Sequence, residues 1–466
     1  MSSSSATNFE HASPRQVRRA IATSVIGNGF EWFDFLAYAY FSKVIGQVFF
    51  PGTSSVASLS LALATFALGF IVRPIGGALL GIYADRVGRA RAFSLLMLMM
   101  CVGTLLLGLA PGYATIGIAA PLLVVLARLI QGLAIGGQFS MSSVIVVENA
   151  PPGKKMFYGS FNMSAQALAM LLSSGLSFLL TSHLSTASLN AWGWRVPFLI
   201  GSLVGPLGFY IRHRVGESKE FEASRARSAT QARVSMLRRV RDFVSQQGDA
   251  ALCAMGVMVI GTASNYLWNA YLPLYVEHQL HLPLKSALFG TFIAASLNVV
   301  LFPFSGKLAD RFGAYRLFYP FVIAWALCTL PLFWFIVSAP SIGRLLAAQI
   351  VASLFQAAIA GPHPGMLSAL FPARARTTGV AISYNLAVTL FGGLAPLTVT
   401  LLTQATGSSF VPAFYVIAAA LISLALVRFT RTGQAALAAD RAERHVGRAT
   451  HNDDSMERAA NASQRP

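Results

Sequence analysis

Four charged residues lie inside apolar runs long enough to cross a membrane, where an ionisable side chain is costly and usually functional. Glu31 and Asp34 share one run, and Arg73 and Arg128 lie in two others. A spacing of three places the two acids on one helical face, which Tyr38 continues. Two acids and two arginines sum to zero charge, so protonation of either acid would leave a positive charge to balance an anion. Glu31, Asp34 and Arg128 therefore predict proton coupling to anion binding; a static buried ion network is the alternative.

The two arginines are the predicted anchors for a carboxylate. A guanidinium can fork onto a carboxylate through two parallel hydrogen bonds. Arg73 is the better candidate because the Pro-x-Gly-Gly segment that begins at the next residue lets another helix approach closely. Arg128 is a rival or a partner in this role. The residue types do not choose between Glu31 and Asp34 as the proton carrier.

Neutral polar side chains also recur at helical spacing inside the apolar runs. Each either lines a cavity or bonds across to a neighbouring helix, and both interpretations stay open. His363, between two prolines, would suit a proton relay, but a satisfied imidazole at a helix break is the preferred interpretation. Besides the two arginines, the predicted substrate contacts are Tyr38, Gln131, Asn162, Gln166, Asn265, Trp268, Asn269, Gln356 and Asn385.

The composition requires a membrane to hold these residues. Of the 466 residues, 55% are apolar and only 11% are charged, whereas soluble domains carry about 25% charged residues. A membrane-spanning helix needs about 20 apolar residues. The sequence supplies six apolar runs, an Arg-rich polar stretch, and six more runs. The runs lie near residues 20–48, 57–82, 92–111, 115–147, 156–181, 194–211, 250–277, 285–305, 316–337, 343–371, 377–403 and 410–429.

The basic residues set the predicted orientation. The net charge is +18, and most Lys and Arg residues fall in the gaps on one side of the predicted membrane, which is the cytoplasmic side by the positive-inside rule. Because these residues sit in short gaps rather than on a folded face, we expect no nucleic-acid partner. The predicted divisions are a cytoplasmic segment (1–19), a six-helix bundle (20–211), a cytoplasmic linker (212–249), a second six-helix bundle (250–429) and a cytoplasmic tail (430–466).

An internal repeat relates the two halves at an offset of 225 residues. A Gly-x-x-x-Asp-Arg-x-Gly motif occurs in each half, at equivalent ends of apolar runs. Parallel repeats of this kind are typical of transporters in which two bundles enclose a site near the midplane. The motif loops are predicted to be cytoplasmic gates, because exposed ion pairs are weak enough to open in each cycle. Their residues are Gly81, Asp85, Arg86, Gly88 and Arg89, and Gly306, Asp310, Arg311 and Gly313.

These motifs resemble those of the major facilitator superfamily over residues 15–430. The loop motif and Arg128-x-x-Gln131-Gly132 resemble general family signatures. Three narrower segments resemble the metabolite–proton symporter branch: Gly27-Asn28-x-x-Glu31-Trp32-Phe33-Asp34-Phe35, Arg73-Pro74-x-Gly76-Gly77, and Trp192-Gly193-Trp194-Arg195-x-Pro197-Phe198. The chain departs from the usual family pattern at Ala90, Gln138 and Ala314.

The resemblance implies an all-α polytopic membrane protein with twelve transmembrane helices in two pseudo-symmetric six-helix bundles. It implies a transporter, not an enzyme, that imports an organic carboxylate, citrate-like or a dicarboxylate, with protons by alternating access. The alternatives are a proton symporter of proline, betaine or a shikimate-type aromatic acid, and a uniporter or exchanger on the same fold. We expect a bacterial inner-membrane protein with both termini cytoplasmic, functional as a monomer in the lipid bilayer.

No cofactor or metal is expected. The three cysteines are isolated inside apolar runs, and no metal-ligand spacing occurs. A carrier driven by ATP would need a GxxxxGK[ST] loop or a partner subunit, and the chain has no such loop.

Overall fold

The structure is a computed structural model that describes residues 29, 32–52, 54–87, 89–148, 150–203, 236–372 and 375–439. The described residues form helices joined by short turns, and no strand occurs among them. Side chains of the first motif loop, including Asp85, Arg86 and Arg89, lie outside the described set, as do Glu31 and Gly88.

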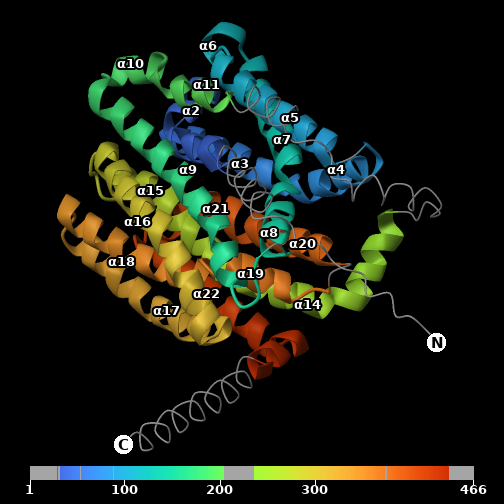
Figure 1. Cartoon of the computed structure of the whole chain (residues 1–466). Helices are drawn as coiled ribbons and strands as arrows, with labels where there is room; N and C mark the ends of the chain where they lie inside the picture. Colours follow the sequence, from blue (N-terminus) through green and yellow to red (C-terminus); the bar gives the residue numbers. More distant parts are fainter. Residues whose placement is uncertain are drawn as a thin grey trace, which may run out of the picture.

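The first half begins with a helix over residues 32–40 that leads into the helices shown in blue to green in Figure 1. They are α2 (Ser42–Phe49), α3 (Ser55–Ile71), α4 (Arg73–Val87), α5 (Arg89–Leu109), α6 (Tyr113–Ile116), α7 (Ala119–Ile135), α8 (Gln138–Glu148), α9 (Lys155–His183), α10 (Thr186–Ala191), the 3-10 turn η1 (Gly193–Arg195) and α11 (Val196–Gly201).

The second half repeats this order. It contains α14 (Met236–Asn265), the π-helical segment η2 (Tyr266–Tyr271), α15 (Leu272–Gln279), α16 (Leu284–Phe312), α17 (Ala314–Ser338), α18 (Ile342–Ala360), α19 (His363–Ala369), α20 (Arg376–Val388), the π-helical segment η3 (Thr389–Gly393), α21 (Ala395–Thr406) and α22 (Val411–Phe429). The predicted linker boundary at residue 249 falls inside α14, which begins at Met236.

Within the described residues, nine helices are long and apolar enough to cross a membrane. Continuous helices such as α3–α4 and α7–α8 each count once. The other three predicted spans correspond to the helix over residues 32–49, to α5 with its shorter apolar stretch Ser94–Leu109, and to the span that begins with α11. The predicted all-α, polytopic fold is therefore confirmed.

The repeat is visible in matching helix breaks. The fourth span of each half is interrupted, between α7 and α8 at Gly136 and between α18 and α19 at Gly361. Each glycine lies against the second span of its own half. A Cβ at Gly136 would lie 2.0 Å from the carbonyl oxygen of Arg73, and one at Gly361 would lie 2.9 Å from that of Phe302. Glycine at both breaks therefore allows backbone-to-backbone packing.

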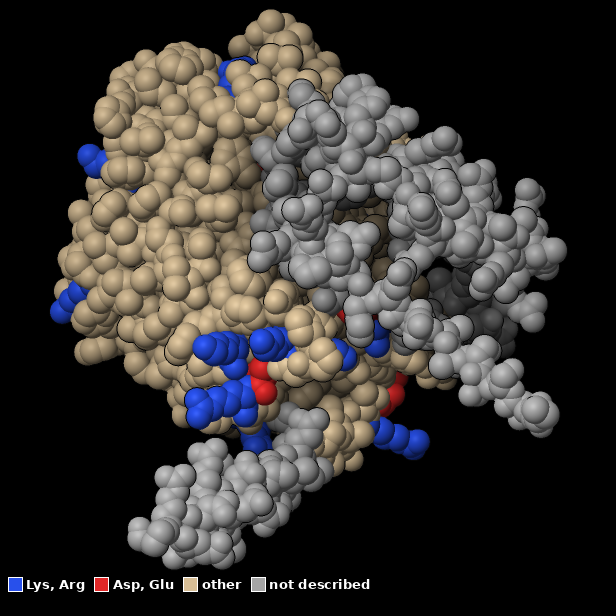
Figure 2. Space-filling model, in the orientation of Figure 1, with Lys and Arg blue, Asp and Glu red and all other residues tan. Residues whose placement is uncertain are grey.

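The halves meet along a few helices. α9 of the first half packs against α16 of the second, α20 packs against α4 and α8, and α3 packs against η3 and α21 (Figure 1). On the face seen in Figure 2, most of the described Lys and Arg side chains gather at the lower end of the molecule, near the end of α22. The wide tan surface above them carries few charged side chains, as expected of a surface that a bilayer would cover.

Candidate functional site

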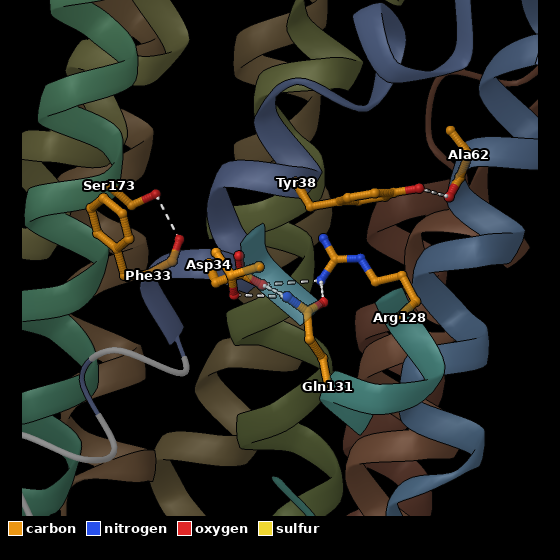
Figure 3. A network of polar contacts seen from close by, with 8 residues as sticks. Phe33, Asp34, Tyr38, Ala62, Arg128, Gln131 and Ser173 are labelled. Atoms are coloured by element: carbon orange, nitrogen blue, oxygen red, sulfur yellow. Dashed lines mark hydrogen bonds and ion pairs between the residues drawn. The ribbon is translucent and has the colours of Figure 1, made fainter. Parts of the chain in front are cut away.

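A buried ion pair connects the first and fourth spans of the first half. Asp34 Oδ2 accepts hydrogen bonds from Arg128 Nη1 at 3.2 Å and from Gln131 Nε2 at 2.8 Å (Figure 3). Arg128 Nη1 also donates to Gln131 Oε1 at 2.8 Å, and Gln131 Nε2 donates to Thr104 Oγ1 at 2.9 Å. Asp34 and Arg128 are 1% and 0% exposed, so no water competes with this pair in the structure. The network holds a carboxylate where its protonation would break the ion pair.

Aromatic rings hold the two arginines. The Arg128 guanidinium carbon lies 3.8 Å from the centre of the Tyr38 ring, and the Arg73 guanidinium carbon lies 4.1 Å from that of Phe70. The Phe35 ring is within 5.2 Å of both guanidinium groups. A cation over an aromatic face gains stabilisation that increases when water is excluded. Tyr38 is itself fixed, because its hydroxyl donates to the carbonyl oxygen of Ala62 at 3.0 Å.

Glycine residues allow the second and fourth spans, which carry Arg73 and Arg128, to pack closely. A Cβ at Gly132 would lie 2.1 Å from the carbonyl oxygen of Gly69, and one at Gly76 would lie 2.1 Å from that of Leu133. The second and fourth spans therefore touch through their backbones. This close packing is what the Arg-Pro-x-Gly-Gly segment predicted, and both arginines lie near the Phe35 ring.

The buried formal charges that the structure describes lie in one half of the molecule. Among side chains that the structure describes, the buried residues with a formal charge are Asp34, Arg73 and Arg128. All three belong to the first half, as the sequence predicts. Glu31, the fourth predicted member, lies outside the described residues.

A central cavity lies beside this network, between the halves. Its volume is small, about 40 Å³, and it is lined from both sides, by Trp32 and Gln166 of the first half and by Asn265, Asn298 and Gln356 of the second. Apart from the imidazole of His363 and the hydroxyl of Thr262, which also line it, the lining residues are neutral amides, aromatic rings and apolar residues. Pockets of this composition suit a small molecule that is oriented by a few hydrogen bonds.

Three of the predicted substrate contacts line the cavity: Gln166, Asn265 and Gln356. Asn269 lies behind two of them, because its Nδ2 donates to Asn265 Oδ1 and to Gln356 Oε1, each at 2.9 Å. Since both amide oxygens accept from Asn269, the NH2 groups of Asn265 and Gln356 are left to donate to a ligand.

The other predicted contacts lie outside the lining, each for a visible reason. Asn162 pairs with the hydroxyl groups of Ser142 and Ser143 inside the first half. The Trp268 ring packs against other aromatic rings. Asn385 Nδ2 donates to the carbonyl oxygen of Gly136 at 2.6 Å, joining the halves. Arg73, Arg128, Tyr38 and Gln131 belong to the buried cluster of charged, amide and aromatic side chains described above and are not among the lining residues.

Sequence reasoning did not select three residues that line the cavity: Trp32, Tyr266 and Asn298. The rings of Trp32 and Tyr266 contact each other across the halves, with centres 5.4 Å apart and planes tilted by 54°. Asn298 follows Arg73 by 225 positions, which is the offset of the internal repeat. That equivalence was the available signal, because a residue equivalent to a buried arginine occupies the same depth in the second half.

The halves are held together at one end by the second motif loop. Asp310, near the end of α16, accepts hydrogen bonds from the backbone N–H groups of Met156 and Phe157 at the start of α9, both at 2.9 Å. A carboxylate at a helix N-terminus satisfies unpaired donors and opposes the positive end of the helix dipole. At the same end, Arg376 forms an ion pair with Glu148 at 2.6 Å.

A second ion pair joins the halves at the opposite end, where α16 begins. Lys43 Nζ of α2 lies 2.6 Å from Glu277 Oε1 of α15. Their side chains are 35% and 24% exposed. The two residues are more than two hundred positions apart, so no local spacing predicts this pair. With contacts at both ends, the cavity lies between two closed regions.

Two helical halves, related by a repeat and packed around a cavity that residues of both halves line, define a membrane transporter of the alternating-access class. The chain matches the family model of the Major Facilitator Superfamily over residues 20–343 and 291–452. The chain belongs to this superfamily.

Curated relatives agree with this assignment. The chain is 33% identical over 409 residues to the citrate-proton symporter of Klebsiella pneumoniae, with 87% of this chain and 90% of the relative covered. It is 30% identical over 424 residues to the proline/betaine transporter of Escherichia coli (strain K12), with 88% and 82% covered. Among solved structures, the xylose transporter XylE of E. coli matches with a TM-score of 0.70 and 20% identity over 89% of this chain and 99% of that one. This last likeness shows the fold.

Proposed function

We propose that this protein imports an organic carboxylate together with protons. The observation that carries the proposal is a cavity lined by amides beside the buried ion pair of Asp34 and Arg128, in which protonation of Asp34 would leave the positive charge of Arg128 unbalanced. Donors and nearby positive charge favour an anion, and the cavity itself adds no competing carboxylate among its described lining residues. Similarity to the citrate-proton symporter of Klebsiella pneumoniae supports the same substrate class.

In this proposal Asp34 is the proton carrier and Arg128 its switchable partner. Protonated Asp34 releases Arg128 from the ion pair, so the first half gains one positive charge and attracts the anion. When the anion leaves, that charge again favours the ionised carboxylate, and the proton leaves too. The coupling is therefore reciprocal, as linkage requires. Arg73, held under Phe70, contributes positive potential rather than a fork to the substrate.

The two closed ends are proposed as the alternating gates. The end with Asp310 and Arg376 is taken as cytoplasmic because the Lys and Arg residues gather there. The end with Lys43 and Glu277 then faces outward. We propose a bacterial inner-membrane location, cytoplasmic termini and function as a monomer, without cofactor, metal or nucleic-acid partner.

The test is solute accumulation in proteoliposomes under an imposed inward proton gradient. Labelled citrate, succinate, shikimate, proline and betaine are compared, with and without a protonophore. A carboxylate should accumulate, by about tenfold per coupled proton for a one-unit pH gradient. The protonophore should abolish this accumulation. Accumulation of only proline or betaine would favour the zwitterion alternative, and uptake that ignores the gradient would favour a uniporter or exchanger.

A charge reversal tests the outward gate. Lys43→Glu places like charges where the ion pair with Glu277 stood, so the outward-open state should become more populated. A cysteine in place of Thr262, which lines the cavity, should then react up to about fivefold faster with an impermeant maleimide added outside, since a part-exposed pair contributes about 0–1 kcal/mol. The native cysteines are first replaced by serine.

The double variant Lys43→Glu with Glu277→Lys is the matched control. It restores opposite charges at the same two positions, so labelling should return to the original rate. Unchanged labelling in the single variant, or equal acceleration in both, would contradict a gating role.

A further inference from the structure

Four buried polar atoms around the central cavity have no hydrogen-bond partner among the described residues. They are Trp32 Nε1, Gln166 Nε2, Asn298 Oδ1 and His363 Nε2. Buried polar atoms are nearly always satisfied, because an unsatisfied one loses its bonds to water without replacement. The donor or acceptor character of these four atoms therefore indicates which hydrogen-bonding groups a ligand in the cavity must have.

The chemistry of these atoms is not symmetric. An indole Nε1 and an amide Nε2 can only donate, whereas the amide oxygen of Asn298 can only accept. The donors Trp32 and Gln166 come from the first half, and Asn298 comes from α16 of the second half. A ligand that bridges the halves must bring oxygen acceptors on one side and a hydrogen-bond donor on the other.

His363 completes the second-half side. Its ring lies against Gly261, where a Cβ would be 2.3 Å from the imidazole Cε1, so only glycine at that position leaves room for the ring. The side chain is 1% exposed. The imidazole is therefore held at the cavity wall by the backbone of α14, with Nε2 able to bond to a ligand oxygen.

We propose that the cavity selects a carboxylate that also carries a hydroxyl group, and that Asn298 Oδ1 accepts the hydrogen bond from that hydroxyl. Trp32 and Gln166 donate to the carboxylate oxygens. This inference rests on the proposed function, because it specifies which carboxylate the site takes. A site built to bond to a hydroxyl discriminates strongly against an analogue that lacks it.

The experiment compares acids that differ only in this group. Citrate is paired with tricarballylate, which has the same three carboxylates and no hydroxyl, and malate is paired with succinate. We measure the KM for proton-driven uptake of each acid in proteoliposomes. In the wild type, the deoxy acid should have a KM about tenfold or more above that of its hydroxy partner, since leaving a buried acceptor unsatisfied has an effect of this size.

Asn298→Leu replaces the amide acceptor with an apolar side chain of similar volume. In this variant, the KM values of the hydroxy acid and the deoxy acid of each pair should agree within about twofold. Gln349→Leu is the matched control, because Gln349 is an equally buried amide on α18 that faces Gly290 outside the cavity lining. It should keep the wild-type ratio. The wild-type ratio alone tests the proposal if the leucine variant does not fold.

The outcomes separate this inference from the proposed function. Equal KM values in the wild type for both pairs would overturn the role of Asn298 while leaving carboxylate import intact. A hydroxyl preference that persists in Asn298→Leu would also overturn it. No proton-driven uptake of any of the four acids would overturn the proposed function, and this inference with it.

Discussion

Asp34→Asn should abolish proton-driven accumulation while leaving exchange of substrate across the membrane. The amide matches the carboxylate in shape but cannot lose or gain a proton at neutral pH, so Arg128 keeps one environment through the whole cycle. Under a one-unit pH gradient the accumulation ratio should fall about tenfold, to equilibration, for one coupled proton. The measurement is gradient-driven uptake beside counterflow of labelled substrate in the same vesicles.

Glu31→Gln is the matched comparison for this variant. Glu31 lies on the same predicted face as Asp34, and the sequence alone left the two acids equal as proton carriers. The assignment to Asp34 rests on its bonds to Arg128 and Gln131. If Glu31→Gln alone removed accumulation while Asp34→Asn kept it, the carrier would be Glu31. If both variants kept full accumulation, the proton assignment would be wrong.

Gly136→Ala should strongly destabilise the fold. A Cβ at this position would lie 2.0 Å from the carbonyl oxygen of Arg73 and 2.4 Å from the backbone nitrogen of Gly77. Backbone atoms cannot rotate away as a flexible side chain does, so the second and fourth spans must separate. We expect a loss of about 3 kcal/mol or more, at the upper end for overpacking. The checks are the monodisperse fraction in detergent and the melting temperature.

Gly137→Ala is the control, one residue further along. No atom lies within 4 Å of a Cβ built at Gly137, so the variant should melt at or slightly above the wild-type temperature, because alanine lowers the entropy of the unfolded chain. The separation of the spans in Gly136→Ala would also move Arg128 and Gln131 away from Asp34. Equal melting temperatures for the two variants would contradict the packing argument.

Much of the fold follows from the sequence because membrane physics leaves few alternatives. In lipid, the backbone N–H and C=O groups of a segment must form hydrogen bonds within that segment. Apolar runs of the observed length therefore become helices. The repeated motif predicted two related halves at an offset of 225 residues. The same offset relates Gly136 to Gly361, and the structure breaks the fourth span of each half at these glycines. The ends of the helices were harder to predict from the sequence. For example, α14 begins at Met236, inside the polar stretch that was predicted to be a linker.

The candidate site was only partly predictable, because spacing along a helix does not say which neighbour a side chain meets. Asp34 and Arg128 were selected because they are charged residues inside apolar runs, and they form an ion pair in the structure. The same logic favoured Arg73 as a substrate anchor, yet its guanidinium lies over Phe70, outside the cavity lining, while its counterpart Asn298 lines the cavity. The pair of Lys43 and Glu277 joins different halves and has no signal in local spacing.

The most direct test of the account is the internal pH of proteoliposomes when citrate is added outside, with no gradient imposed. A trapped pH dye reports the interior, and labelled citrate reports entry in the same vesicles. The account predicts that the interior acidifies as citrate enters with wild-type protein, and that entry continues without acidification in Asp34→Asn. Entry of citrate through the wild-type protein with no change of internal pH would contradict proton symport.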